Sequence, residues 1–127
     1  MNAITNKEKD AVLMGAARRA MRFWGLTDEQ AETLTAVSAA RFDAAGNKRI
    51  VMQYGITEDS RERLKQVTSL YRELHASFGD GVADTWLTAP NQATVFEGHT
   101  PLGFILQDPE AGMFLTISHL RSRSQGC

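Results

Sequence analysis

The stretch Asp84–Gly112, DTWLTAPNQATVFEGHTPLGFILQDPEAG, contains most of the turn and capping signals that organise the chain. Pro90-Asn91 ends the helix that precedes it, and Gly98 permits a left-handed turn. Thr100-Pro101 and Asp108-Pro109 each pair a capping side chain with a proline at the first position of a helix. The stretch therefore predicts short helical pieces joined by tight turns, which is typical of a compact interaction module rather than of an active site.

Helical periodicity continues on the N-terminal side of this stretch. A first helix is expected from Lys7 to Trp24, with Gly25 ending it. Thr27 then begins a second helix, with Gln30 three residues later as the other half of a capping box. The side chains that the periodicity places inside are Leu13, Ala16, Ala17, Ala20, Phe23 and Trp24 in the first helix, and Ala31, Leu34 and Val37 from the second onwards.

A third, short helix is expected over 39–45. Ser38 can cap it, Phe42 is its buried side chain, and Gly46 ends it. Two helices joined by a turn of about three or four residues have the layout of a helix-turn-helix. The first 56 residues are therefore expected to form a helix-turn-helix-like region.

In that layout the third helix would enter a DNA groove. Arg41 is its one strong reader of bases or phosphates, and Lys48 and Arg49 just after it can add backbone contacts. Ser38, Arg41, Lys48 and Arg49 are thus the candidate DNA-binding residues. The alternative is a plain helical hairpin whose exposed charges are merely solvated, and it stays open.

The longest helix is expected from Glu58 to Phe78, capped by Thr57, with Gly79 ending it and Asp80 capping the next helix. Its apolar positions recur at steps of three and four, as in a seam between helices, and part of that seam is expected to pair with a second copy of the chain. The seam residues are Leu64, Val67, Tyr71, Leu74 and Phe78.

The later helices have inner faces of their own. The expected inner side chains are Val82, Ala83, Trp86 and Leu87, then Leu102, Ile105 and Leu106, then Met113, Phe114, Ile117 and Leu120. From Arg121 onwards the chain reads as a polar tail with too few apolar groups to fold alone.

Only residues 50–56 lean towards a small β-element or an extended connection. The fold class is therefore mainly α: a compact multi-helix protein with little or no sheet. Its two parts are residues 1–56, the helix-turn-helix-like half, and residues 57–127, the long helix and the interaction module.

Composition is ordinary for a folded protein, with 43% hydrophobic and 23% charged residues in a chain of 127. The net charge of -1 combines eight basic and six acidic residues in 1–50 with six basic and nine acidic ones in 51–127. The small excess of basic residues in 1–50 is compatible with contacts to DNA phosphates but does not by itself indicate DNA binding. No apolar run is long enough for a membrane span, and the start lacks the pattern of a signal peptide, so we expect a cytoplasmic protein.

Catalytic and metal-binding patterns are not found. His75, His99 and His119 have no metal-ligand partner at helical spacing, and Asp80 and Asp84 read as a solvated acidic pair. The only cysteine is Cys127, so no disulfide within the chain is expected. We therefore expect no enzyme, no cofactor and no metal.

Several residues together resemble the C-terminal domain of the MbcA/ParS/Xre antitoxin family, over about Leu74 to Cys127. The residues that carry this resemblance are Trp86-Leu87, Pro90-Asn91, Gly98, Thr100-Pro101-Leu102, Gly112 and Gly126. More weakly, the segment from Gly25 to Gly46 resembles the Xre-type helix-turn-helix that precedes that domain, although its second helix is rich in alanine.

The resemblance implies an antitoxin of a type II toxin-antitoxin system, partnered with a RES-domain toxin that consumes NAD. It also implies a homodimer that represses its own operon by binding operator DNA. The end of the chain would approach the toxin's active-site cleft, where a glycine lets the backbone come close and arginines pair with cleft groups. The implied toxin-binding residues are Arg121, Arg123, Ser124, Gln125, Gly126 and Cys127.

Two other functions remain open at this point. One is a stand-alone DNA-binding transcriptional regulator that works without a toxin. The other is an adaptor or dimerisation module that does not bind nucleic acid.

Overall fold

The computed structural model describes residues 3–44 and 56–125. In these residues the chain is helical and has no strand, so the prediction of a mainly α fold is confirmed. The β-element expected over 50–56 lies, except for Ile56, outside the described residues. None of the helices in the described part is both long and apolar enough to span a bilayer.

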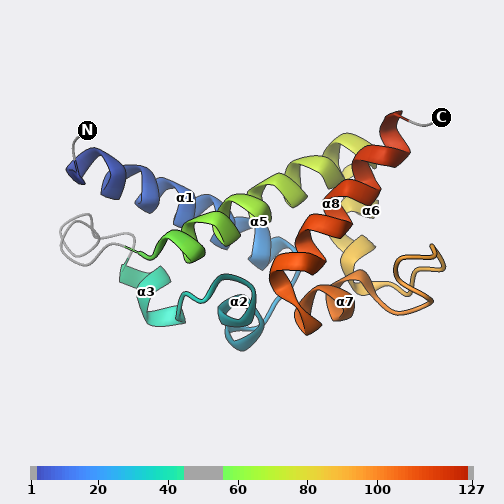
Figure 1. Cartoon of the computed structure of the whole chain (residues 1–127), viewed down its shortest axis with the longest axis horizontal. Helices are drawn as coiled ribbons and strands as arrows, with labels where there is room; N and C mark the ends of the chain where they lie inside the picture. Colours follow the sequence, from blue (N-terminus) through green and yellow to red (C-terminus); the bar gives the residue numbers. More distant parts are fainter. Residues whose placement is uncertain (1–2, 45–55, 126–127) are drawn as a thin grey trace. The chain divides into compact units, whose positions relative to one another are not determined.

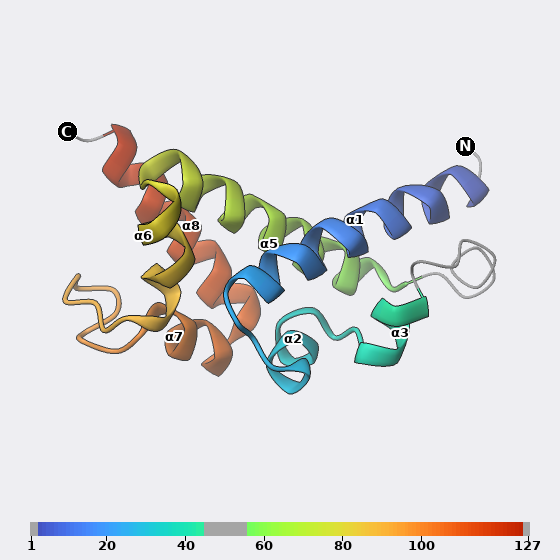
Figure 2. The same cartoon turned by 180° about the vertical axis from the view of Figure 1, so that it is seen from behind.

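The chain forms two compact units, up to Thr68 and from Ser69. The first contains α1 (Ala3–Phe23), α2 (Asp28–Thr35), α3 (Ala39–Ala44) and the beginning of α5 (Glu58–Ser77). α3 packs on both α1 and α2 (Figures 1 and 2). The apolar side chains buried in this unit are Met14, Ala17, Ala20, Met21, Trp24, Leu34, Val37, Phe42, Leu64 and Val67.

The expected inner face of α1 is partly wrong. Phe23 is 58% exposed, whereas Met14 and Met21 are buried. Met14, Ala17, Met21 and Trp24 follow one another at steps of three and four, so they share one helix face. Phe23 precedes Trp24 by about 100° around the helix and therefore lies off that face.

The caps expected for α2 and α3 are confirmed. The Gln30 backbone N–H donates to Thr27 Oγ1 at 3.1 Å, and the Thr27 N–H donates to Gln30 Oε1 at 2.9 Å. α2 ends at Thr35, and its C-cap, Ala36, adopts a left-handed conformation with φ of 60°. The Arg41 N–H donates to Ser38 Oγ at 3.2 Å and begins α3. These two caps fix the beginnings of α2 and α3, the two helices that the sequence predicts as a helix-turn-helix.

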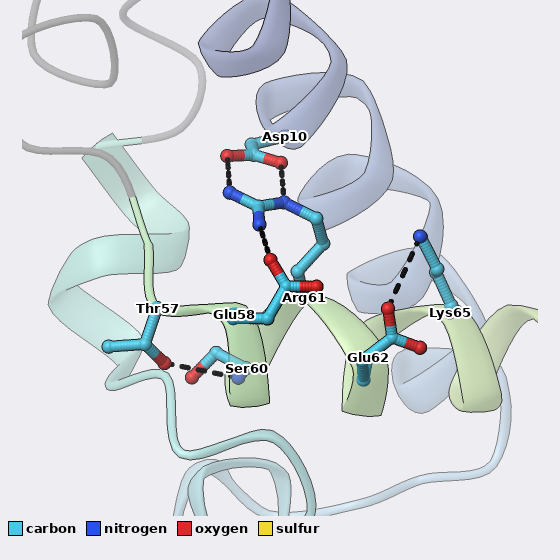
Figure 3. Close-up of polar contacts among 7 residues, drawn as sticks. All are labelled: Asp10, Thr57, Glu58, Ser60, Arg61, Glu62 and Lys65. Atoms are coloured by element: carbon cyan, nitrogen blue, oxygen red, sulfur yellow. Dashed lines mark hydrogen bonds and ion pairs between the residues drawn. The ribbon is translucent and has the colours of Figure 1, made fainter. Parts of the chain in front are cut away.

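An ion pair links α1 and α5 within the first unit (Figure 3). The Asp10 carboxylate is buried, and it accepts from Arg61 Nε at 2.7 Å and from Arg61 Nη2 at 2.9 Å. Thr57 caps α5 as predicted, since its Oγ1 accepts from the Ser60 N–H at 3.1 Å, and Arg61 also reaches Glu58. The hydrogen bond with Asp10 raises the pKa of Arg61, so the guanidinium remains charged.

The second unit contains the rest of α5, then α6 (Asp80–Thr85), the 3₁₀ helix η1 (Trp86–Thr88), α7 (Pro101–Gln107) and α8 (Pro109–Gln125). α7 and α8 lie side by side in both views, and α7 also contacts η1 (Figures 1 and 2). The buried apolar side chains are Leu70, Leu74, Ala83, Trp86, Leu87, Phe96, Leu102, Ile105, Met113, Ile117 and Leu120.

Two expectations about the start of α6 are wrong. Gly79, not Asp80, occupies the N-cap position, and no side chain caps the helix. Asp80 is instead the first helical residue, and its carboxylate lies 3.0 Å from His75 Nδ1. Val82, expected inside, is 52% exposed. In so short a helix Ala83 alone faces the interior, and Trp86 and Leu87 follow in η1.

The seam expected to pair with a second copy is mostly used inside the chain. Leu64, Val67 and Leu74 are fully buried, while Tyr71 and Phe78 are half-buried. Side chains that are already buried cannot be buried again by a partner. Of the five seam residues, only Tyr71 and Phe78 therefore leave surface for a second copy.

Candidate functional site

The loop between η1 and α7 is closed by hydrogen bonds at its two ends. The Asn91 N–H donates to the His99 carbonyl at 3.1 Å, and the Gly98 N–H donates to the Asn91 carbonyl at 2.8 Å. Gly98 has a φ of 86°, as its place in the sequence predicted, and Glu97 before it also has a positive φ of 53°. The ring of Phe96 is almost completely buried, so it anchors the loop in the core of the second unit.

Phe96 lies at the centre of an aromatic cluster. Its ring centroid is 5.6 Å from that of Trp86, 5.5 Å from that of Phe104 and 5.4 Å from that of His119, each nearly perpendicular to it. Such edge-to-face pairs add to the stabilisation that burial gives. Burial, and next the charge of Arg123, lower the pKa of His119 below its ordinary value of 6.5.

The turns into α7 and α8 form as expected. Thr100 Oγ1 accepts from the Gly103 N–H at 3.0 Å, and Pro101 begins α7. Asp108 Oδ1 accepts from the Ala111 N–H at 3.3 Å. Gly112 then lets α8 approach α7 closely, because a Cβ at this position would lie 2.6 Å from the Ile105 Cα. The motif residues of this stretch therefore build one packed module.

α8 has two apolar faces. The inner one is formed by Met113, Thr116, Ile117 and Leu120, all buried. The other, here called the α8 outer face, consists of Ala111, Phe114, Leu115 and Ser118, all exposed to solvent. Phe114 is 62% and Leu115 is 43% exposed, so the expectation that Phe114 lies inside is wrong.

Thr116 explains why the sequence pattern assigned Phe114 to the interior. Gly112, Met113, Thr116, Ile117 and Leu120 recur at helical steps and leave no room for Phe114 on the same face. A polar threonine at a fully buried position hid this pattern in the sequence.

The polar tail expected from Arg121 onwards is helical as far as Gln125, which corrects the prediction of a frayed end. Arg121 Nε donates to Glu73 Oε1 at 2.9 Å, and the Arg123 guanidinium lies 5.0 Å from the centroid of the Phe78 ring. These two contacts explain why a polar segment continues the helix. Ser124 and Gln125 belong to this last turn, while Gly126 and Cys127 lie outside the described residues.

The candidate DNA-binding residues are only partly described. Ser38 serves as the cap of α3, and Arg41 on α3 is half-buried. Lys48 and Arg49 lie outside the described residues, so the four are not shown to form one surface. Arg18 of α1 reaches the same helix from the other side, pairing with Asp43 and lying 5.7 Å from the Phe42 ring centroid.

Sequence reasoning missed one polar constellation. His75 lies at the end of α5, its Nδ1 is 3.0 Å from Asp80 Oδ1, and its Nε2 is 3.8 Å from Asp84 Oδ1. The two aspartates therefore lie near a histidine; Asp80 is solvated as expected, with its side chain 92% exposed, whereas Asp84 is 31% exposed. The turn at Gly79 brings them together, which spacing along one helix could not indicate. Among the described residues no group of His, Cys, Asp and Glu could hold a metal ion.

Comparison of the chain with models of protein families, with curated proteins and with solved structures finds no match.

Proposed function

We propose that this chain is a cytoplasmic antitoxin that binds and neutralises a RES-domain, NAD-consuming toxin, and that it represses its own operon by binding operator DNA. The observation that carries the proposal is the α8 outer face. A helix that buries one apolar face against its own module and exposes another has a second surface suited to a protein partner. The residues that resemble the MbcA/ParS/Xre domain, from Trp86 to Gly112, lie in the module that presents this face.

Phe114 and Leu115 are the proposed anchors of the toxin contact. Large apolar side chains at the centre of an interface carry most of its binding energy, and no charged residue occurs between Ala111 and Ser118 to oppose their burial. The 62% exposure of Phe114 leaves most of that ring available to a partner.

The end of α8 is proposed to block the toxin's NAD cleft. At the protein surface Arg121 pairs with Glu73, and Arg123 lies over the ring of Phe78. An exposed salt bridge and an exposed cation–π contact each contribute about 1 kcal/mol or less. The arginines can therefore exchange these contacts for hydrogen bonds to cleft groups at little cost, together with Ser124, Gln125, Gly126 and Cys127.

Binding of purified toxin to a Phe114→Glu variant tests the anchor. A carboxylate at the centre of the contact must be desolvated, so affinity should fall about 100-fold or more. Val82→Glu is the matched control, since Val82 is an exposed apolar residue of the same unit outside α8 and should leave affinity unchanged. Equal affinity of Phe114→Glu and the unmodified chain would reject the α8 outer face as the toxin contact.

Operator binding is the second part of the proposal. It is supported by the capped pair α2 and α3 and by Arg41, which has no ion-pair partner among the described residues. Replacing Arg41, Lys48 and Arg49 together with alanine should abolish the shift of the chain's own upstream DNA and weaken its salt dependence. If the unmodified chain does not bind that DNA with or without toxin, the chain neutralises without repressing.

The same toxin-binding and DNA-binding assays distinguish this proposal from the two other functions that the sequence leaves open. A stand-alone regulator would bind operator DNA but no RES-domain toxin. An adaptor or dimerisation module would bind neither.

A further inference from the structure

The outward side of α1 carries four residues in an unusual order. Glu8, Val12, Gly15 and Arg19 follow one another at steps of four, three and four, so they lie on one helix face, here called the α1 stripe. Val12 is 73% exposed, which is more than Phe114. The stripe borders an open groove that is lined by Glu8, Lys9, Val12, Leu13 and Ala16 of α1 and by Thr68 of α5.

The two charged side chains of the stripe have no partner in the described part of the chain. Glu8 and Arg19 are exposed, and neither has an ion-pair or hydrogen-bond partner among the residues that the structure describes. The acidic residue precedes Val12 and the basic one follows Gly15. A second α1 in the same direction would place like charges opposite each other, whereas an antiparallel one would place each Glu8 opposite an Arg19.

The apolar positions agree with the same antiparallel register. Glu8 and Arg19 are equally far from the midpoint between Leu13 and Met14, and so are Val12 and Gly15. A two-fold axis through that midpoint therefore brings each Glu8 to the partner's Arg19 and each Val12 onto the partner's Gly15. A Cβ at Gly15 would lie 3.6 Å from Arg19 Nη1, so the flexible Arg19 side chain lies over Gly15 and has to swing aside, towards the partner's Glu8, to admit Val12.

We infer that the α1 stripe is a self-association surface, on which two copies of this chain pair antiparallel about a two-fold axis. The interface is isologous: two Val12-to-Gly15 contacts form its apolar centre, and two Glu8–Arg19 ion pairs lie at its ends. This inference does not depend on the proposed function, because it uses no residue of α8 or α3. It also supplies a more exposed surface than the α5 seam, of which only Tyr71 and Phe78 are half-buried.

Charge reversal tests the register. Glu8→Arg and Arg19→Glu each convert two attractive contacts into two repulsive ones, so each should weaken dimerisation about tenfold or more in sedimentation equilibrium. The double variant Glu8→Arg/Arg19→Glu restores both pairs with their signs exchanged and should dimerise like the unmodified chain. Failure of the double variant to recover would overturn the antiparallel pairing.

Val12→Glu tests the apolar centre, because two carboxylates would meet near the axis. It should give a monomer up to about 100 µM protein, with circular dichroism like that of the unmodified chain. Val82→Glu is again the control and should remain dimeric. The inference is overturned if the unmodified chain is itself a monomer at that concentration, as a stripe reserved for a different partner would make it, or if Val12→Glu leaves the dimer intact.

Discussion

The guanidinium of Arg61 grips the carboxylate of Asp10 with two hydrogen bonds, of 2.7 Å and 2.9 Å, and thereby joins α5 to α1. The side chain of Asp10 is 4% exposed and that of Arg61 is 25% exposed. A buried carboxylate is tolerated only when it is paired and hydrogen-bonded, and the two-pronged geometry of arginine provides both.

Removing Asp10 should therefore destabilise the protein strongly. Asp10→Ala leaves the Arg61 guanidinium partly buried without its main partner, and we expect the free energy of unfolding to fall by about 2–4 kcal/mol. Urea denaturation measures this change. Glu58→Ala is the control, because Glu58 also contacts Arg61 but is 75% exposed, and it should cost well under about 1 kcal/mol. Similar costs for the two variants would contradict the importance of burial.

A methyl group at Gly112 should disrupt the contact of α7 with α8. The added Cβ would lie 2.6 Å from the Ile105 Cα, and backbone cannot move aside as a side chain can. Gly112→Ala is thus expected to cost about 1–3 kcal/mol, despite the better helix propensity of alanine. Gly81→Ala, in α6, has nothing within 4 Å of its Cβ and should be neutral or slightly stabilising in the same thermal melts.

A substitution at Thr116 should increase the stability of the protein, in contrast to the two above. Its side chain is fully buried, and Oγ1 has no hydrogen-bond partner in the part of the chain that the structure describes. Thr116→Val keeps the shape and removes the unpaired hydroxyl, so stability should rise by about 1 kcal/mol. Thr116→Ser, which keeps the hydroxyl and loses a methyl group, should instead lower it. Destabilisation by valine would show that the hydroxyl is satisfied.

His119 should make the stability of the protein depend on pH. Burial and the neighbouring Arg123 lower its pKa in the folded state below the ordinary 6.5, so the unfolded chain binds the proton more readily. Its contribution is therefore complete above pH 6.5 and is lost as pH falls through the folded pKa. His119→Phe should flatten the fall in stability below pH 6.5, as measured by urea denaturation at a series of pH values. Arg123→Ala should flatten it only slightly, because burial is the larger cause.

Most of the local structure could be predicted because it depends on neighbours in the sequence. The capping box of Thr27 and Gln30, the cap at Ser38 and the left-handed Gly98 each involve residues within a few positions of one another. Such contacts form wherever the backbone begins or ends a helix, whatever lies around them.

Which side chains of a helix face the interior was harder to predict, because it depends on packing against other helices. Phe23, Val82 and Phe114 are large and apolar, yet all three are exposed, while Thr116 is buried. A helix has one inner face, and the side chains that fill it are chosen by fit against other helices as well as by hydrophobicity. Exposed apolar residues are the ones that a sequence pattern assigns wrongly, and they are also the ones that point to partners.

The helical structure of the polar segment after Leu120 could not be predicted from the sequence either. Arg121 to Gln125 contain no apolar residue, so composition predicted no folded structure. Contacts with Glu73 and Phe78, roughly 50 positions earlier in the chain, extend α8 through this segment. Partners so distant in sequence cannot be identified from the tail itself.

Truncation after Leu120 should separate toxin binding from toxin inhibition. The deletion removes surface contacts, among them Arg121–Glu73 and Arg123–Phe78, but none of the buried apolar side chains of the second unit, so the protein should remain folded. The α8 outer face is untouched, and the truncated chain should still bind the toxin while failing to protect NAD from consumption. Phe114→Glu in the full chain should fail at the earlier step and not bind at all. Arg123→Ala and Gly126→Trp should give intermediate protection, the first by losing a charged contact and the second by obstructing a narrow cleft. If the truncated chain protects NAD as well as the full one, inhibition comes from the helical surface, and the last turn of α8 only extends the helix.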